Sequence, residues 1–357
     1  MIEARALTRR EDLERYVAFA HDVYRGNPYW VPPDPHLAAT LAGESAAGRH
    51  CRIQPFAVEA GGRFLATATA VVDELFNQQW RDRIGHVVFF EALDGEEEAA
   101  GAVLDAVTGW LKAQGCRLAR VSFLYGWQLP LTIDAYDRVP TAFHTYNPPS
   151  YHRLIKQAGF VSECGLVEYR VQFTPELEDR YADYESAAAN ADVTLRAWDF
   201  DRPKPEAERF AASYNESFAS HWGAAQFTVA EIEEFIAGLK EVGAADLTVF
   251  AEHRGDVVGS VLAVPDFNQL AGQTPGSQAS AIDHGILLSI SVTPAFRGRG
   301  INLAMAARSY RIMMARGYKS ASYTTVLDTN RPSRRTAEKL GARIARNFVV
   351  YQRALGQ

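Results

Sequence analysis

The chain has few cysteines and no pattern typical of a metal or redox site. Its three cysteines, Cys51, Cys116 and Cys164, are scattered, odd in number and without CxxC spacing. They predict neither a disulfide framework nor a zinc site. We therefore expect no bound metal and a cytoplasmic location, where thiols stay reduced.

Long hydrophobic runs are also missing. No stretch of about 18 apolar residues is present to cross a bilayer, and residues 1–10 are charged and lack the apolar core of a secretory signal. HExxH, GxSxG and EF-hand patterns are absent. The net charge of −6 argues against general nucleic-acid binding. Neither a membrane nor a nucleic acid is expected as a partner, and the oligomeric state stays open.

One turn rich in glycine and arginine is the most informative feature that is present. Residues 287–292 predict a buried strand, and residues 301–315, apolar at helical spacing, predict an amphipathic helix. The turn 297–302 between them, Arg-Gly-Arg-Gly-Ile-Asn, therefore lies at a helix N-terminus. Free amides and the helix dipole favour an anion there, and glycines let a phosphate approach the backbone. The spacing fits neither a P-loop nor a dinucleotide fingerprint, so the turn predicts a different kind of pyrophosphate site.

The turn resembles motif A of the GCN5-related N-acetyltransferases (GNAT), [QR]-x-x-G-x-[GA] after a strand and V-x-P. Arg297, Gly300 and Asn302 occupy the three defined positions. Only Asn302 departs from the pattern, because the family has Gly or Ala there.

Residues 330–342 resemble motif B of the same family, N-x-x-[AS]-x-x-x-Y-x-K-x-G-[FA]. Asn330 and Ser333 match the pattern, but Ala337 stands where the family usually has a Tyr that protonates the departing CoA thiolate. Either another acid serves, or the thiolate leaves unassisted. Asn330 has two readings, a hydrogen bond to the pantetheine arm or a helix cap before Arg331 and Pro332. The resemblance covers about residues 193–357.

The resemblance implies an α/β fold, a mixed and mostly antiparallel sheet flanked by helices, with acetyl-CoA or another acyl-CoA as cofactor. The residues that it places at the cofactor lie on the strand before motif A, in the turn and in motif B: Ile290, Val292, Arg297, Gly298, Arg299, Gly300, Ile301, Asn302, Asn330 and Ser333.

Three residues are candidates for proton transfer. His284, at the start of the strand before motif A, has the titration range of a base, although a histidine beside glycine is often only a loop-end residue. Tyr323 and Tyr351 are candidates to replace the missing acid, against the alternative of ordinary core tyrosines. Glu216, His221 and Trp222 fall where the family's substrate helices lie and are expected to bind the acceptor.

A weaker copy of the same pattern precedes the first. Residues 147–159 repeat the Asn-to-Gly spacing of motif B within a residue, which indicates an internal repeat of about 170 residues. In place of the Arg/Gly turn this copy has Asp-Gly-Glu-Glu-Glu at 94–98, and these carboxylates repel a pyrophosphate. We expect tandem GNAT folds: a degenerate domain without a cofactor turn over 1–175, a linker over 176–192, and an acyl-CoA-binding domain over 193–357.

The predicted function is acyl-CoA-dependent N-acylation, most simply acetylation, of a small-molecule amine. Two alternatives stay open: a catalytically silent acyl-CoA-binding protein and an aminoacyl-tRNA-dependent transferase. The loop 265–280 has no periodicity and is either a lid over the substrate or a disordered insertion.

Overall fold

The computed structural model describes residues 2–124, 126–241, 245–271 and 282–356. It divides the chain into two compact units: unit 1 comprises Met1–Gly165 and Phe348–Gln357, and unit 2 comprises Leu166–Asn347. Strands β7 (Val161–Gln172) and β13 (Arg343–Ala354) each contribute residues to both units. Among the described residues, no helix is both long and apolar enough to span a bilayer.

The units differ from the predicted domain boundaries in two ways. Most of the predicted linker, 176–192, is helix α6 (Pro175–Asn190), which begins with a proline in its first turn and carries acidic residues there. The buried Tyr181 fixes this helix to unit 2, because its hydroxyl donates to the Leu340 carbonyl at 2.6 Å. The end of the chain, predicted to belong to the second domain, forms the last strand of unit 1.

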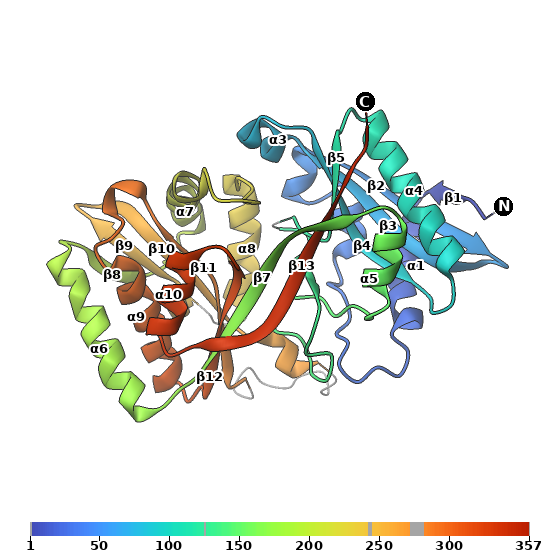
Figure 1. Cartoon of the computed structure of the whole chain (residues 1–357). Coiled ribbons are helices and arrows are strands. Elements are labelled where there is room, and N and C mark those ends of the chain that lie inside the picture. Colours follow the sequence, from blue (N-terminus) through green and yellow to red (C-terminus); the bar gives the residue numbers. More distant parts are fainter. Residues whose placement is uncertain (1, 125, 242–244, 272–281, 357) are drawn as a thin grey trace. The chain divides into compact units, whose positions relative to one another are not determined.

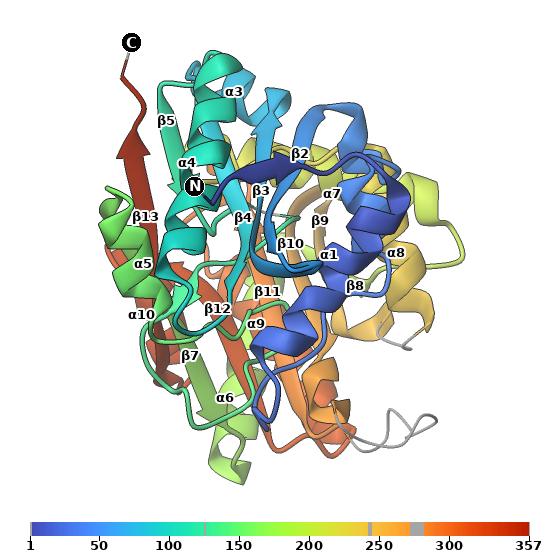
Figure 2. The ribbon, with the colours of Figure 1, turned by 90° about the vertical axis from the view of Figure 1, so that its right-hand side faces the viewer.

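Unit 1 is a twisted sheet with helices on both faces. Its strand order is β1-β2-β3-β4-β5-β13, and β6 pairs with β13. The strands are β1 (Ala4–Ala6), β2 (Cys51–Ala60), β3 (Arg63–Asp73), β4 (Ile84–Ala92), β5 (Leu118–Val121) and β6 (Leu131–Thr132). The helices are α1 (Arg10–Val23), α2 (Leu37–Leu41), α3 (Glu74–Trp80), α4 (Glu97–Ala113) and α5 (Tyr151–Gln157). Figure 2 shows α1 and α4 on either side of the strands β2 to β4.

Unit 2 has the same kind of sheet, in the order β7-β12-β11-β10-β9-β8. The strands are β8 (Thr194–Ala197), β9 (Val249–His253), β10 (Asp256–Pro265), β11 (His284–Val292) and β12 (Ser320–Leu327). Besides α6, the helices are α7 (Pro203–Phe218), α8 (Val229–Glu241), α9 (Ile301–Ala315) and α10 (Arg331–Lys339). Helices α7 and α8 pack together on one face of the sheet, and α9 packs with α6 on the other (Figure 1).

Each sheet contains one parallel strand pair among antiparallel neighbours. In unit 1 the pair is β4 and β5, and in unit 2 it is β11 and β12; each pair stays in register for four positions. Gly85 and Gly285 lie in these four positions, and a Cβ on either would collide with a side chain of the covering helix, Leu111 of α4 or Met313 of α9. Glycine is therefore needed for close helix packing at the same place in both sheets. The predicted fold class, a mixed and mostly antiparallel sheet flanked by helices, is confirmed.

Candidate active site

The turn between β11 and α9 has the backbone of an anion site. Gly298 and Gly300 have φ of 79° and 80°, a left-handed conformation that side chains disfavour. Gly300 is the N-cap of α9, and no side chain caps this helix. A Cβ at either glycine would meet nothing within 4 Å in the described part of the chain. Both glycines therefore leave room beside the N-terminus of α9, where a phosphate could approach the backbone.

The two arginines of the turn brace its backbone. Arg297 donates through Nε to the Val292 carbonyl at 3.1 Å and through an Nη to the Ser217 carbonyl at 2.6 Å. Arg299 donates to the Ala295 carbonyl at 3.1 Å and lies 4.7 Å from the ring centre of Phe296. Their positive charges stay beside the α9 N-terminus, so they add to the field that favours an anion.

Motif B forms α10, and its asparagine acts as a cap. The Asn330 Oδ1 accepts a hydrogen bond from the Ser333 amide at 3.2 Å, which is the capping alternative of the sequence analysis. The departure at Asn302 also has a structural reason: its Nδ2 donates to Thr336 Oγ1 at 2.8 Å and so joins α9 to α10. Ala337, the next residue along α10, is fully buried.

Strand β11 has an open edge next to the turn. Its register with β12 ends at Leu287 opposite Tyr323, whereas its register with β10 continues to Val292 after a bulge. In the described structure, residues 288–292, which include the predicted cofactor residues Ile290 and Val292, thus have no β12 partner. An extended ligand can pair with main-chain groups along such an edge.

Tyr323 lies where the two strands separate. Its hydroxyl is 2.8 Å from the Ser333 hydroxyl in the first turn of α10, and burial raises its pKa to about 12. The phenol is therefore protonated at neutral pH and able to donate. Tyr351 instead belongs to unit 1, where its hydroxyl lies 2.9 Å from His152 Nδ1. The structure does not place it among the unit 2 candidates.

His284 is buried inside the sheet. Its Nδ1 lies 2.7 Å from Ser320 Oγ and its Nε2 lies 2.8 Å from Ser322 Oγ. Burial, with the nearby Arg170 charge, lowers its pKa to about 3. Because both nitrogens are engaged, a base role for His284 would have to pass through one of the two serines.

The three predicted acceptor residues lie at and after the end of α7. Glu216 is exposed, whereas His221 and Trp222 are half-buried. Burial and the charge of Arg297 lower the pKa of His221, so this imidazole is neutral at neutral pH and lies within the field of the turn. The contact of Arg297 with the Ser217 carbonyl brings the end of α7 to the same turn. Most of the predicted lid, 272–280, lies outside the described residues.

Four polar residues around His284 are absent from the sequence-based prediction. Glu168 and Arg170 on β7 and Ser320 and Ser322 on β12 are hydrogen-bonded to one another or to His284. The alternation of serine with apolar residues over 320–323 is the one sequence signal that indicates a polar face there.

In unit 1, side chains occupy the edge of β4 that corresponds to the open edge of β11 in unit 2. After β4 and β5 separate, the Phe89 amide donates to Gln128 Oε1 at 2.7 Å, and the Ala92 amide donates to the Tyr151 hydroxyl at 2.8 Å. Side chains of the unit itself thus satisfy amides on the edge of β4. The following helix, α4, begins with Glu97 and Glu98, as the acidic turn predicts.

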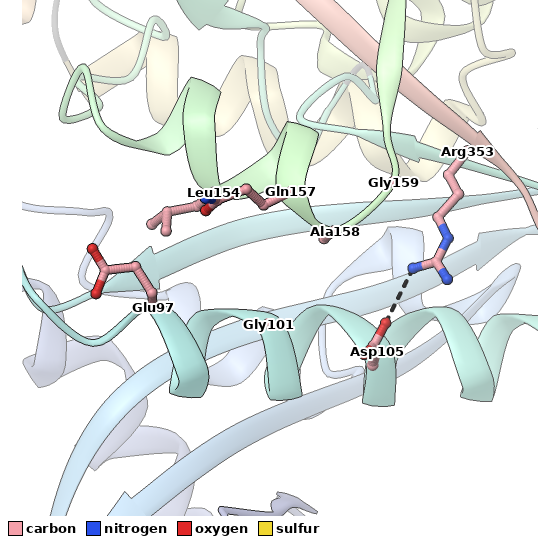
Figure 3. A pocket seen from close by; sticks show the side chains of 8 residues that line it. All are labelled: Glu97, Gly101, Asp105, Leu154, Gln157, Ala158, Gly159 and Arg353. Atoms are coloured by element: carbon pink, nitrogen blue, oxygen red, sulfur yellow. Dashed lines mark hydrogen bonds and ion pairs between the residues drawn. The ribbon is translucent and has the colours of Figure 1, made fainter.

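A pocket of about 380 Å³ lies between α4 and α5 in unit 1 (Figure 3). Its charged groups are paired within the unit: Arg353 with Asp105 at 3.1 Å, and Arg153 with Glu97 at 2.9 Å. The pocket therefore offers no unpaired charge from these residues to a phosphate ligand.

Residues 198–342 match the sequence model of the acetyltransferase (GNAT) family. This segment is a GNAT domain. The tandem arrangement has a structural parallel in a tandem GNAT protein from the clavulanic acid biosynthesis pathway, with a TM-score of 0.59 and 12% identity over 100% of this chain and 99% of that chain. The predicted tandem GNAT fold is thus confirmed.

Two curated relatives extend beyond this domain. The bacterial ceramide synthase of Caulobacter vibrioides is 22% identical, covering 96% of this chain and 95% of the relative. Protein YghO of Escherichia coli is 24% identical, covering 76% of this chain and 70% of the relative.

Proposed function

We propose that the GNAT domain of unit 2 is an acyl-CoA-dependent N-acyltransferase. The observation that carries the proposal is the uncapped, glycine-lined N-terminus of α9 beside the open edge of β11. Both features have the form that acyl-CoA needs, a site for its pyrophosphate and an edge for its extended arm.

The residues present fit this cofactor. Amides of the turn 297–302, with the charges of Arg297 and Arg299, would hold the pyrophosphate. Main-chain groups of residues 288–292, apart from the Val292 carbonyl that accepts from Arg297, would pair with the pantetheine arm. The exposed side chains of Arg331 and Arg335 on α10 add positive charge to unit 2. When bound, acyl-CoA supplies an activated thioester carbonyl to the acceptor.

Two side chains are suited to move the protons of the reaction. The amine nitrogen forms a bond to the acyl carbon as the carbon–sulfur bond breaks, so the amine loses a proton and the thiolate gains one. The neutral imidazole of His221 can accept the first proton, because burial and the Arg297 charge lower its pKa and so leave it unprotonated before the reaction. The Tyr323 hydroxyl, paired with that of Ser333, can donate the second and so replace the tyrosine missing at Ala337.

The acceptor class that we propose is based on a relative that aligns with nearly the whole chain. That relative is named a bacterial ceramide synthase, and a ceramide is the amide of a fatty acid with a long-chain amino alcohol. We therefore propose long-chain amino alcohols as the first acceptors to test, with small polar amines second. Acetyl and long-chain acyl donors are both included in the proposal, because the residues of the turn would contact only the part that all acyl-CoA molecules share.

The test is an assay of thiol release from acetyl-CoA and palmitoyl-CoA with a panel of amines, with the amide product identified by mass. Amide formation with at least one pair is expected. CoA binding with no amide from any pair would favour the silent binding protein, for which the alanine at 337 is the supporting observation. No CoA binding would overturn the proposal.

A further inference from the structure

A chain of polar side chains crosses three neighbouring strands of unit 2. An Nη of Arg170 on β7 donates to Ser320 Oγ on β12 at 3.2 Å, and Ser320 Oγ lies 2.7 Å from His284 Nδ1 on β11. On its other side, His284 Nε2 lies 2.8 Å from Ser322 Oγ, which donates to Glu168 Oε1 of β7 at 2.5 Å. Apart from Arg170, these residues are buried.

The two charged ends give the chain a direction. A carboxylate only accepts, so the Ser322 proton goes to Glu168, and the Ser322 oxygen must accept from His284 Nε2–H. A guanidinium only donates, so the Ser320 oxygen accepts from Arg170. Burial lowers the pKa of His284 to about 3, so the ring is neutral at neutral pH. With its one proton on Nε2, the Nδ1 atom accepts from the Ser320 hydroxyl.

The chain lies just before the point where β12 separates from β11 and its register with β7 shifts. The register of β12 with β11 ends at Tyr323, and its register with β7 shifts between Tyr323 and Val326. Between them Thr325 has φ of 40°, so the strand bends there. Ser322 directly precedes Tyr323, whose hydroxyl reaches Ser333. A shift of β12 at Ser322 would therefore move that hydroxyl.

We propose that Glu168 is a positioning residue of the acyl-transfer site: through Ser322 and His284 it fixes β12 where β11 and β12 separate, and so fixes the Tyr323 hydroxyl beside the open edge. The proposal rests on the acyltransferase function of unit 2. Burying polar groups costs free energy unless they are hydrogen-bonded, so a hydrogen-bonded chain through four buried polar residues is not explained by packing alone. Directional hydrogen bonds between strands also add to the register that the hydrophobic pattern sets.

The experiment compares Glu168→Ala, which removes the acceptor at the end of the chain, with the matched variant Glu168→Gln, which keeps an acceptor oxygen. The tautomer of His284 is read from the ¹⁵N shifts of the ring in the full chain without ligand. We expect the Nε2–H form in the wild type and in Glu168→Gln, and mixed tautomers in Glu168→Ala. With a turning-over pair of substrates, kcat should fall about 10- to 100-fold in Glu168→Ala, while the acyl-CoA KM changes little and Glu168→Gln recovers most of the loss.

Two results would overturn the positioning role. One is a wild-type His284 that carries its proton on Nδ1, or whose ring titrates between about pH 5 and 8. The charges that act on this ring are those of Arg170, Glu168 and Asp283. The other is an unchanged kcat in folded Glu168→Ala. If Glu168→Ala does not fold, Ser322→Ala replaces it, because this variant interrupts the hydrogen-bond chain between Glu168 and His284. An unchanged kcat in folded Ser322→Ala would likewise overturn the positioning role. The tautomer measurement requires no acyl-CoA. If the wild type turns over no substrate, the proposed function is overturned, and the ¹⁵N shifts of the ring still test whether the hydrogen-bond chain exists.

Discussion

The two units have the same strand arrangement but differ at the strand edge that is left where their parallel strands separate. In unit 1, the side chains of Gln128 and Tyr151 accept hydrogen bonds from the amides of Phe89 and Ala92, and the turn after β4 is acidic. In unit 2, β11 keeps its edge beyond Leu287 without a β12 partner, and the turn carries arginines and left-handed glycines.

This difference separates what the fold needs from what a ligand needs. The glycine under the covering helix and the four-position parallel register occur in both units, so they belong to the scaffold. Free edge amides and an uncapped, positively charged turn occur together only in unit 2 of the described structure. Buried backbone groups are paired in folded proteins, and at this edge of unit 1 side chains of the same unit are the partners.

The largest expected effect is on turnover and tests the tyrosines. Tyr323→Phe should lower kcat by about 10² to 10⁴-fold with little change in acyl-CoA binding, because the general acid is lost. Tyr351→Phe, in unit 1, is the matched control and should keep kcat. Equal activity of Tyr323→Phe and the wild type would mean that the thiolate leaves unassisted or that another acid serves. Ala337→Tyr is a converse test of acid assistance, provided that the fully buried site accepts the ring.

The next effect is on affinity and uses two glycines with the same backbone. Gly300 and Gly95 have φ of 80° and 81°, and neither has a described neighbour that a Cβ would touch. Glutamate at either position should strain the turn equally, so a difference between the variants reports on the ligand. By calorimetry, Gly300→Glu should weaken acyl-CoA binding about 100-fold, near 2.7 kcal/mol, and Gly95→Glu should leave it unchanged. The reverse result would assign the cofactor to unit 1.

A third test uses the pH dependence of stability. Burial raises the pKa of Glu91 in unit 1 from 4.5 to about 7, against the hydrogen bonds from the Tyr151 and Tyr24 hydroxyls. Between these values the folded protein keeps a proton that the unfolded chain has released, so stability falls as the pH rises from about 4.5 to 7. Relative to Glu91→Gln, the wild type should lose about 1–3 kcal/mol over this range in urea unfolding. Parallel pH profiles for the two proteins would contradict the raised pKa.

The smallest effect concerns the cap of α10. Asn330→Ala removes the acceptor of the Ser333 amide and should lower the free energy of unfolding by about 1 kcal/mol. Acyl-CoA affinity should change less than about twofold if the asparagine is only a cap, whereas loss of a pantetheine hydrogen bond would cost about two- to tenfold. Unfolding and calorimetry on the same variant distinguish the two roles.

Local chemistry made much of this site predictable. The Arg/Gly turn, the helix after it and the acidic turn of the first copy all follow from short-range rules, because glycine conformation and helix-end charge act within a few residues. The network around Glu168 was not predictable, since its five residues lie on three strands and meet only through the sheet register. Tyr351 fell in the other unit for the same reason: the sequence marks a final strand but not its host sheet.

The final strands carry a further consequence for how this protein can be divided. Strand β7 ends the first repeat, yet residues 166–172 belong to unit 2, and β13 ends the second repeat, yet residues 348–354 belong to unit 1. The two repeats have thus exchanged their last strands within one chain, as swapped subunits do between chains. A cut at residue 193 would take β7 and Glu168 from unit 2 and β13 from unit 1. Neither fragment would then contain all the strands of its own unit, so we expect the two fragments, expressed separately, not to fold into these units.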